Sequence, residues 1–171
     1  FCELKANFFR LILTKAELLA LTPKDFDFEK QTLTINKSYQ RLNGRDVITT
    51  PKTKKSNRVI KMPKFLCEEM QEYIGMLYEV NENDRLFPIT KHYLHHEMDR
   101  GAKLAGVKRI RIHDLRHSHV SLLINQGYQA AAIADRVGHE TVEITDRYTH
   151  IYPSKQNEMA NTLDELWKER K

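Results

Sequence analysis

Apolar residues in this chain change their spacing twice along the sequence. They recur at helical intervals between Leu4 and Leu21, and from Leu33 to Tyr39 they alternate with polar residues, as in a half-buried strand. After Pro63 the helical spacing returns. Because each period fits only one kind of element, the chain predicts an α+β fold that is mostly helical, with a small antiparallel sheet.

The middle of the chain predicts the sheet itself. Residues 33–39 form the first strand, and the Asn-Gly pair at 43–44 is a strong signal for a tight hairpin turn into a strand that begins at 47–48. A third strand is expected over 58–62, after a polar turn. These segments together predict a three-stranded antiparallel meander.

Apolar stripes, capping residues and helix-ending glycines predict the remaining elements. Helices are expected over 66–77, 93–104, 114–125, 130–137 and 141–150, after a first helical segment over 4–21 that is one helix or a broken pair of helices. Asp114 is the expected N-cap of its helix and Gly138 the expected end of the next one. The segment after Ser154 carries an apolar face, which is expected to pack either on its own domain or on a neighbouring protomer.

Length and composition limit the class of protein. At 171 residues the chain is long enough for one domain, and a 40% apolar, 30% charged composition is normal for a globular protein. Two cysteines without paired spacing exclude a disulfide framework, and no apolar run is long enough for a membrane span. A cytoplasmic location is therefore expected. Because the sequence begins inside a helical pattern, we also expect a fragment of a longer protein.

The net charge of +5 is small, but the charge is unevenly distributed. Between residues 31 and 64 there are nine basic residues and one acid, and between 100 and 116 six basic residues and one acid. Such segregation is typical of a surface that binds a polyanion, because neutralised phosphates release counterions. A solvated charged surface without a ligand is the simpler alternative for either cluster alone.

A short constellation of residues carries the chemistry. His113 and Arg116 stand three apart at the start of a predicted helix, where an imidazole, a guanidinium and unpaired amides can converge on one anion. His139 follows a helix-ending glycine, and Tyr148 comes nine residues later. This order can bring a proton-handling group and a phenolic nucleophile to one pocket.

Three motifs, HDLRH at 113–117, VGH at 137–139 and YTH at 148–150, together resemble the signature of the tyrosine recombinases, the phage-type integrases. Residues 17–35 are similar to the family's helix that leads into its small sheet, and 51–63 to the hairpin with its catalytic lysine. The resemblance covers most of the chain. It is strongest to integrases of phages and conjugative transposons of Gram-positive bacteria.

The resemblance implies a role for each matching residue. Tyr148 would attack a DNA phosphodiester and Arg116 would hold a phosphate oxygen. His113 would exchange the tyrosine proton, His139 would hydrogen-bond the phosphorane, and Lys52 would protonate the departing 5′-oxygen. No metal and no cofactor is implied. DNA contacts are expected from Lys54, Lys55, Arg58, Arg109, Arg111 and His117, and Lys54 or Lys55 remains an alternative to Lys52 as the acid.

The resemblance also implies partners. Double-stranded DNA at attachment sites would be bound by a homo-tetramer on two synapsed sites, with an excisionase or a host DNA-bending protein as candidate accessory partners, and no membrane. Residues 1–171 would form the catalytic domain of a site-specific recombinase that integrates or excises a mobile element. The amino-terminal DNA-clamping domains of such proteins would lie outside this chain.

One departure from the family pattern concerns an early arginine. The family places it in a Thr-Gly-x-Arg turn, but here Thr14 runs directly into Lys15. Our preferred hypothesis is that about three residues have been skipped at this junction. If the junction is real, a phosphate clamp is lost and a DNA-binding module without catalysis becomes the alternative. A metal-dependent phosphodiesterase that uses His113, His117 and His119 is a third hypothesis.

Overall fold

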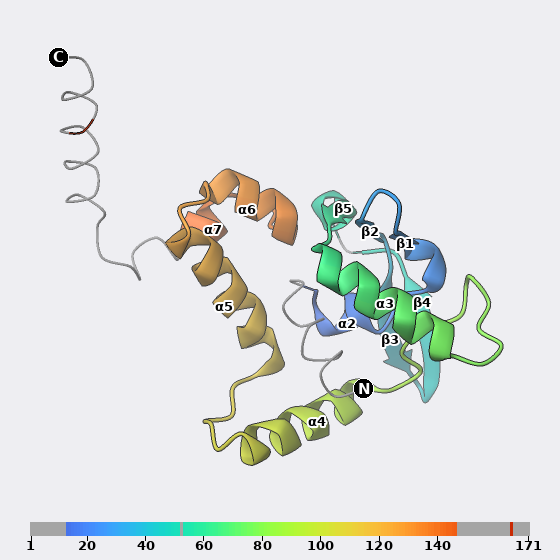
Figure 1. Ribbon diagram of the computed structural model, residues 1–171. Helices are drawn as coiled ribbons and strands as arrows, with labels where there is room; N and C mark the ends of the chain where they lie inside the picture. The colour runs from blue at the N-terminus through green and yellow to red at the C-terminus, as the bar shows by residue number, and fades with distance from the viewer. Residues whose placement is uncertain (1–12, 52, 147–164, 166–171) are drawn as a thin grey trace.

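A three-stranded antiparallel sheet lies at the centre of the larger part of the molecule. The structure, a computed structural model, describes residues 13–51, 53–146 and 165. Strand β2 (Thr32–Ile35) lies between β1 (Phe26–Asp27) and β5 (Arg58–Lys61) (Figure 1). Its Leu33 faces Phe26 on one side and Ile60 on the other, and all three are buried. The predicted three-stranded antiparallel sheet is confirmed, although its members differ from the expected ones.

A separate two-stranded ribbon accounts for the difference. Strands β3 (Ser38–Leu42) and β4 (Arg45–Thr49) pair only with each other among the described strands. Both turn residues at 43–44 have positive φ, 50° and 78°, so the expected hairpin is confirmed. The predicted meander is wrong, because the expected strand over 33–39 breaks between β2 and β3. Tyr39 anchors the start of β3 in the main core, whereas the side chains beyond it are no longer buried, so the rest of the ribbon extends away from the core.

The helices follow the apolar stripes. They are α2 (Lys15–Leu18), α3 (Lys64–Met76), α4 (Lys91–Leu104), α5 (Ile112–Asn125), α6 (Ala130–Val137) and α7 (Glu143–Asp146), with short 3-10 turns η1 (Pro23–Asp25) and η2 (Lys54–Ser56). The four helices α3 to α6 confirm the predictions to within a few residues. None of the helices in the described ranges is both long and apolar enough to cross a membrane.

Two predicted helix boundaries are wrong. The first helical segment was expected to reach residue 21, but α2 ends at Leu18, because Thr22 and Asp25 form a capping pair that starts η1. Asp114 is the third residue of α5 and not its N-cap. Its carboxylate accepts a hydrogen bond from the backbone N–H of Arg111, the observed N-cap, at 2.9 Å. Outside the described residues lie 4–12, the end of the last expected helix and, apart from residue 165, the tail after Ser154.

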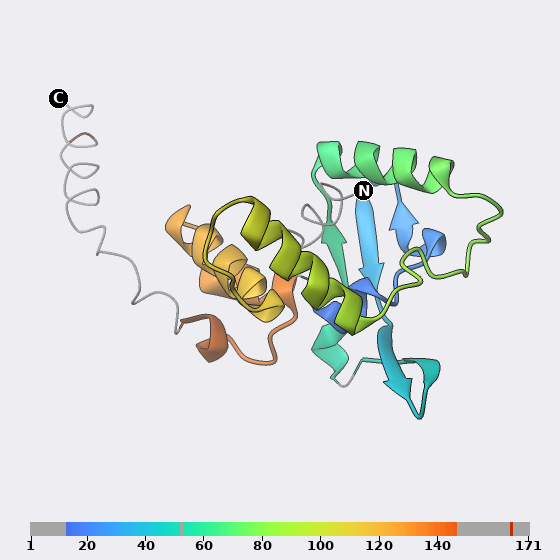
Figure 2. The same cartoon turned by 90° about the horizontal axis from the view of Figure 1, so that it is seen from below.

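Buried apolar residues form two clusters of unequal size. The larger one lies between the sheet, α2, α3 and the first turns of α4 and α5, with Leu33, Met70 and Leu86 fully buried. The smaller one joins Val120 of α5 to Ile133 and Val137 of α6. We call the sheet together with α2 and α3 the sheet body. Figures 1 and 2 show α3 on the sheet and α5, α6 and α7 gathered to one side of the sheet body. The described motif residues His113, Arg116 and His139 lie near where these two parts meet.

Candidate active site

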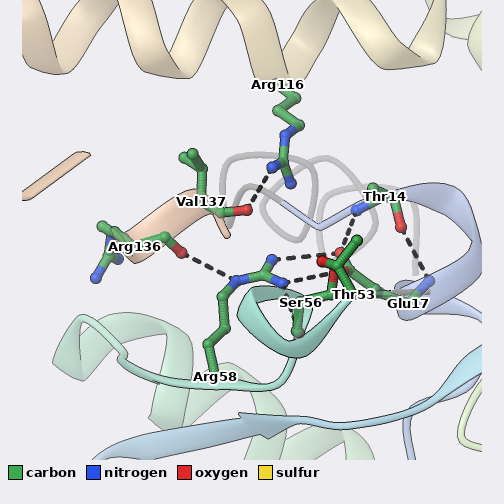
Figure 3. Close-up of polar contacts among 8 residues, drawn as sticks. All are labelled: Thr14, Glu17, Thr53, Ser56, Arg58, Arg116, Arg136 and Val137. Atoms are coloured by element: carbon green, nitrogen blue, oxygen red, sulfur yellow. Dashed lines mark hydrogen bonds and ion pairs between the residues drawn. The ribbon is translucent and has the colours of Figure 1, made fainter. Parts of the chain in front are cut away.

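Helix α5 brings Arg116 to the end of α6. The Arg116 side chain is buried, and its Nη2 donates a hydrogen bond to the backbone carbonyl of Val137 (Figure 3). Val137 is the last residue of α6 and stands two residues before His139. Two motifs that are more than twenty residues apart in the sequence are therefore joined by one side chain.

The end of α6 fixes the position of His139. Gly138 has φ 71°, the left-handed conformation that ends a helix and suits glycine. The His139 N–H then donates to the carbonyl of Ala134 at 2.9 Å. Its ring Nδ1 lies 2.8 Å from the hydroxyl of Thr145, which is fully buried in α7. Because Nδ1 is engaged, Nε2 is the ring nitrogen that can meet a phosphate oxygen.

Burial and nearby positive charge lower the pKa values of His139 and His113. Burial, together with the charges of Arg116 and neighbouring groups, lowers the pKa of His139 to about 4. Burial and the charges of His117 and Arg116 also lower the pKa of His113, although Asp114 opposes them. Each of these groups disfavours a further positive charge on the others. The cluster is therefore suited to receive an anion, whose charge would reverse the shifts.

Arg58 lies inside this site. Its side chain is only 6% exposed and forms an ion pair with Glu17, 2.8 Å from Nη1 to Oε1. We expected Arg58 to contact DNA, and the structure instead places its guanidinium in the interior, between α2 and the end of α6 (Figure 3). A count of basic residues along the sequence cannot distinguish an exposed cation from one that a buried carboxylate holds.

Glu17 connects this ion pair to the start of α2. Its carboxylate accepts the Thr14 N–H at 2.8 Å, and its own N–H donates to the Thr14 hydroxyl at 3.2 Å. Burial by itself raises the pKa of Glu17, but the hydrogen bond and charge of Arg58 and the Thr14 amide outweigh it and lower the pKa. Glu17 is therefore ionised near neutral pH and holds Arg58 as a cation.

A pocket of about 220 Å³ opens beside His113. It is lined by Thr14, Lys15, Lys91 and His113, together with Leu13, Ala16 and Ile112. Thr14 caps α2 and Lys15 is its first residue, so the junction at 14–15 is a regular helix start. Lys15 Nζ lies 3.2 Å from Nε2 of His95. Lysines thus line the pocket at the junction where the family pattern has its arginine.

The other expected DNA contacts are distributed around this centre. Lys54 and Lys55 are exposed on η2, which lies against Gly138. Arg109 forms an exposed ion pair with Asp99. Arg111 pairs with Asp114, and the ring of His117 meets the ring of His113 edge to face, with centroids 4.7 Å apart. Tyr148 and Lys52, the expected nucleophile and acid, lie outside the described residues.

Three residues of the site were missed by the sequence analysis. Glu17 stands three residues after Thr14, a spacing that signals a capping box and could have been found. The backbone carbonyl of Arg136 accepts from Arg58, and Thr145 contacts His139, but neither has a local signal. Both depend on how α6 and α7 turn back toward the sheet body.

The histidines of α5 do not form a metal cluster in the described part of the chain. Across residues 13–51 and 53–146, no group of three or more His, Cys, Asp or Glu side chains is placed to hold a metal ion. The buried Nε2 of His119 has no hydrogen-bond partner among the described residues.

A buried arginine and two histidines of lowered pKa, with further cations nearby, form an arrangement suited to phosphoryl chemistry. The profile of the phage integrase family matches residues 10–155. The chain belongs to this family, whose members are the tyrosine recombinases.

Individual relatives agree with this assignment. The chain is 38% identical over 164 residues to the ICEBs1 integrase of Bacillus subtilis (strain 168), which covers 88% of this chain and 45% of that protein. It is 28% identical over 168 residues to the integrase of Staphylococcus phage L54a, which covers 88% of this chain and 48% of that protein. The chain therefore spans about half the length of these relatives.

Solved structures show the same fold. The Tn1549 transposon integrase in complex with a circular intermediate DNA matches with a TM-score of 0.73 and 22% identity, over 93% of this chain and 56% of that chain. The XerH site-specific recombinase bound to its difH substrate matches with a TM-score of 0.61 and 26% identity, over 92% of this chain and 45% of that chain. The expected fold, mostly helical with a small antiparallel sheet, is confirmed.

Proposed function

We propose that this chain is the catalytic domain of a site-specific DNA recombinase that integrates or excises a mobile element. The observation that supports it most is the contact of Arg116 with the Val137 carbonyl, because it brings the guanidinium and His139 to one place. Phosphoryl transfer depends mainly on donors that stabilise charge on the equatorial oxygens of the phosphate. A buried arginine beside a neutral histidine supplies such donors.

In the proposed step, the phenol oxygen of Tyr148 attacks the phosphorus of a DNA phosphodiester. The new bond from tyrosine to phosphorus forms while the bond to the 5′-oxygen breaks, which leaves a 3′-phosphotyrosine and a 5′-hydroxyl. His113 takes the phenol proton and Lys52 gives a proton to the 5′-oxygen. Rejoining to another strand reverses these transfers. It needs no ATP, because the covalent link retains the energy of the broken bond.

Arg116 and His139 hold the non-bridging oxygens in this scheme. His139 is neutral before DNA binds, because its pKa is lowered to about 4, and Nε2 can then donate one hydrogen bond if Thr145 donates to Nδ1. The negative charge of a phosphate would raise this pKa and strengthen the contact. The same phosphate would be attracted by the cations that surround the site.

Double-stranded DNA is the proposed partner. The DNA-bound structures of the Tn1549 integrase and of XerH support it, as do exposed Lys54, Lys55 and Arg111 around the site. We extend the proposal to a homo-tetramer on two synapsed sites, aided by an excisionase or a host DNA-bending protein, in the bacterial cytoplasm. DNA-clamping domains on the amino-terminal side would complete the protein.

A DNA-binding module with impaired catalysis is the second candidate, and the direct junction of Thr14 with Lys15 favours it. Against it, Lys15 and Lys91 line the pocket beside His113 and supply positive charge there. Replacing Lys15 with methionine separates the two candidates when Lys24→Met, an exposed lysine on η1, serves as the control. The recombinase proposal expects slower cleavage only in the Lys15 variant.

The decisive experiment uses a nicked duplex from which the cleaved end diffuses away, so that the covalent intermediate accumulates. The full-length protein should become covalently attached to this DNA, also in EDTA, whereas its Tyr148→Phe variant should bind without attachment. Binding without any adduct supports the impaired module. Cleavage that EDTA abolishes supports a metal-dependent phosphodiesterase, and an adduct in the variant shows that the nucleophile is another residue.

A further inference from the structure

We infer that Arg58 is a positioning residue, which sets the place of Arg116 and His139 from inside the protein without touching DNA. The inference rests on the proposed function, since it names a residue on which the cleavage step depends. Four hydrogen bonds of the Arg58 guanidinium to three other segments carry it (Figure 3).

The first segment is the start of α2. Arg58 Nη1 and Nη2 donate to the two carboxylate oxygens of Glu17, at 2.8 and 3.3 Å. Both side chains are nearly closed to solvent, at 6% and 8% exposure. A buried bidentate pair has one preferred geometry, so the guanidinium plane is fixed relative to α2.

The second segment is the end of α6. Arg58 Nε donates to the carbonyl of Arg136 at 3.0 Å, and the next carbonyl, that of Val137, accepts from Arg116. Two arginines from different elements therefore hold successive carbonyls of one helix end. His139 follows two residues later, so a shift of this end would move the catalytic arginine and the histidine together.

The third segment is the turn η2 before β5. Arg58 Nη1 also donates to the Ser56 carbonyl at 3.2 Å. Gly138 lies directly against this region, because a Cβ added to it would come within 2.9 Å of the Lys55 carbonyl and 3.1 Å of Arg58 Cδ. The close approach holds η2, with its two lysines, against the helix end. Arg58 thus bonds to α2, η2 and α6 at once.

The test separates positioning from phosphate binding and from loss of stability. Arg58→Lys keeps the positive charge but loses the planar fork that reaches three segments. We expect it to bind DNA within about 3-fold of the wild type, with an unchanged salt dependence, while the single-turnover cleavage rate at saturating DNA falls at least about 100-fold. If Arg58 instead contacts a phosphate, Arg58→Lys should weaken binding by more than about 3-fold and preserve the rate at saturating DNA, which would overturn the inference.

Asp25→Asn is the matched control for stability. Asp25 is as buried as Glu17 and forms an ion pair with Lys37 at 2.8 Å, but it has no contact with α6. Both variants should lower the melting temperature, and only Arg58→Lys should slow cleavage at a temperature where both remain folded. Equal slowing in the two variants would reduce Arg58 to a general stabiliser and contradict the inference.

Amide hydrogen exchange gives a readout that needs no catalysis. The N–H groups of Gly138 and His139, bonded to Asp135 and Ala134, should exchange faster in Arg58→Lys and at the wild-type rate in Asp25→Asn. Unchanged exchange in Arg58→Lys would overturn the inference even if the recombinase is active. If the wild type forms no adduct with DNA, the proposed function fails, while the exchange measurement still decides the role of Arg58.

Discussion

The sheet body and the helical group of α5, α6 and α7 are held together in different ways. In the sheet body, burial of apolar side chains such as Leu33, Met70 and Leu86 dominates. The described core of the helical group is small, and Leu122 of α5 remains 53% exposed. Of the candidate catalytic residues, the described ones, His113, Arg116 and His139, belong to the second part.

Polar contacts to backbone carbonyls join the two parts. Arg58 of the sheet body donates to the Arg136 carbonyl of α6, and the Arg136 side chain returns a bond to the Lys61 carbonyl of β5 at 3.1 Å. Hydrogen bonds are directional, whereas apolar contacts tolerate small displacements. The comparison indicates that the sheet body determines the stability of the domain and that the polar junction determines the geometry of its site.

The largest effect is expected from Arg116→Ala. Loss of a preorganised donor costs about 100- to 1,000-fold in rate. Here the variant also leaves the Val137 carbonyl without its bond from α5, so we expect a cleavage rate about 1,000-fold below the wild type on the nicked duplex that traps the covalent intermediate. Arg100→Ala, which removes an exposed ion pair with Glu97 on α4, should cleave normally. Comparable losses in both variants would contradict a specific role for Arg116.

Truncations in the two cores should separate stability from activity. Met70 is fully buried on α3, and Met70→Ala should lower the free energy of unfolding by about 3 kcal/mol. Val120→Ala removes less volume from the small cluster and should cost about 1 to 2 kcal/mol. Urea unfolding and single-turnover cleavage measure both quantities.

The opposite order is expected for cleavage. Folded Met70→Ala should cleave close to the wild-type rate, because its cavity lies in the sheet body. Val120→Ala should cleave more slowly, since α5 and α6 carry the site. If the rates instead follow stability, the division between the two parts is wrong.

Gly138→Ala tests the contact between the sheet body and the helical group. Its positive φ makes any side chain strained, and the new Cβ would meet the Lys55 carbonyl at 2.9 Å. Gly106, with φ 64° and open space around it, provides the matched control for strain alone. Gly106→Ala should cost about 1 kcal/mol and Gly138→Ala about 2 kcal/mol in unfolding free energy, and only the latter should slow cleavage. Equal effects on both measures would show that the contact has no role.

The local elements were predictable where a short pattern determines them. The stripe through Leu66 and Met70 predicted α3, and the Asn-Gly pair predicted the turn of the ribbon. The pairing of β2 with β5 was not predictable in the same way. It depends on where the chain returns after the ribbon, and local alternation carries no information about the partner strand.

The candidate site shows the same division. His113, Arg116 and His139 could be selected because they stand in motifs of fixed spacing. The interior position of Arg58 could not, since it requires Glu17 from an element about forty residues earlier. Spacing along the chain thus selected the candidate reacting groups, whereas the groups that hold the described ones come from distant segments.

The smallest effect is expected from pH. Burial and the charges of Arg136 and Arg116 lower the pKa of His119 to about 4, and the pKa of His139 is also lowered to about 4. The ordinary histidine pKa is near 6.5, so between pH 6.5 and 4 the unfolded chain binds more protons than the folded one. The free energy of unfolding must therefore fall as the pH falls through this range, and it should not change for this reason above it.

Both side chains retain some contact with solvent, which screens the effect to about 1 kcal/mol for each. Urea unfolding at several pH values measures it. His119→Leu should remove about half of the pH dependence, because one of the two shifted histidines is then gone. The buried Nε2 of His119 has no hydrogen-bond partner among the described residues, so the substitution costs no hydrogen bond there. Leu122, which is 53% exposed on the same helix and cannot titrate, is the control, and Leu122→Ala should leave the slope unchanged. An unchanged slope in His119→Leu would place the acid sensitivity elsewhere, whereas a reduced one would trace it to the helical group that carries the site.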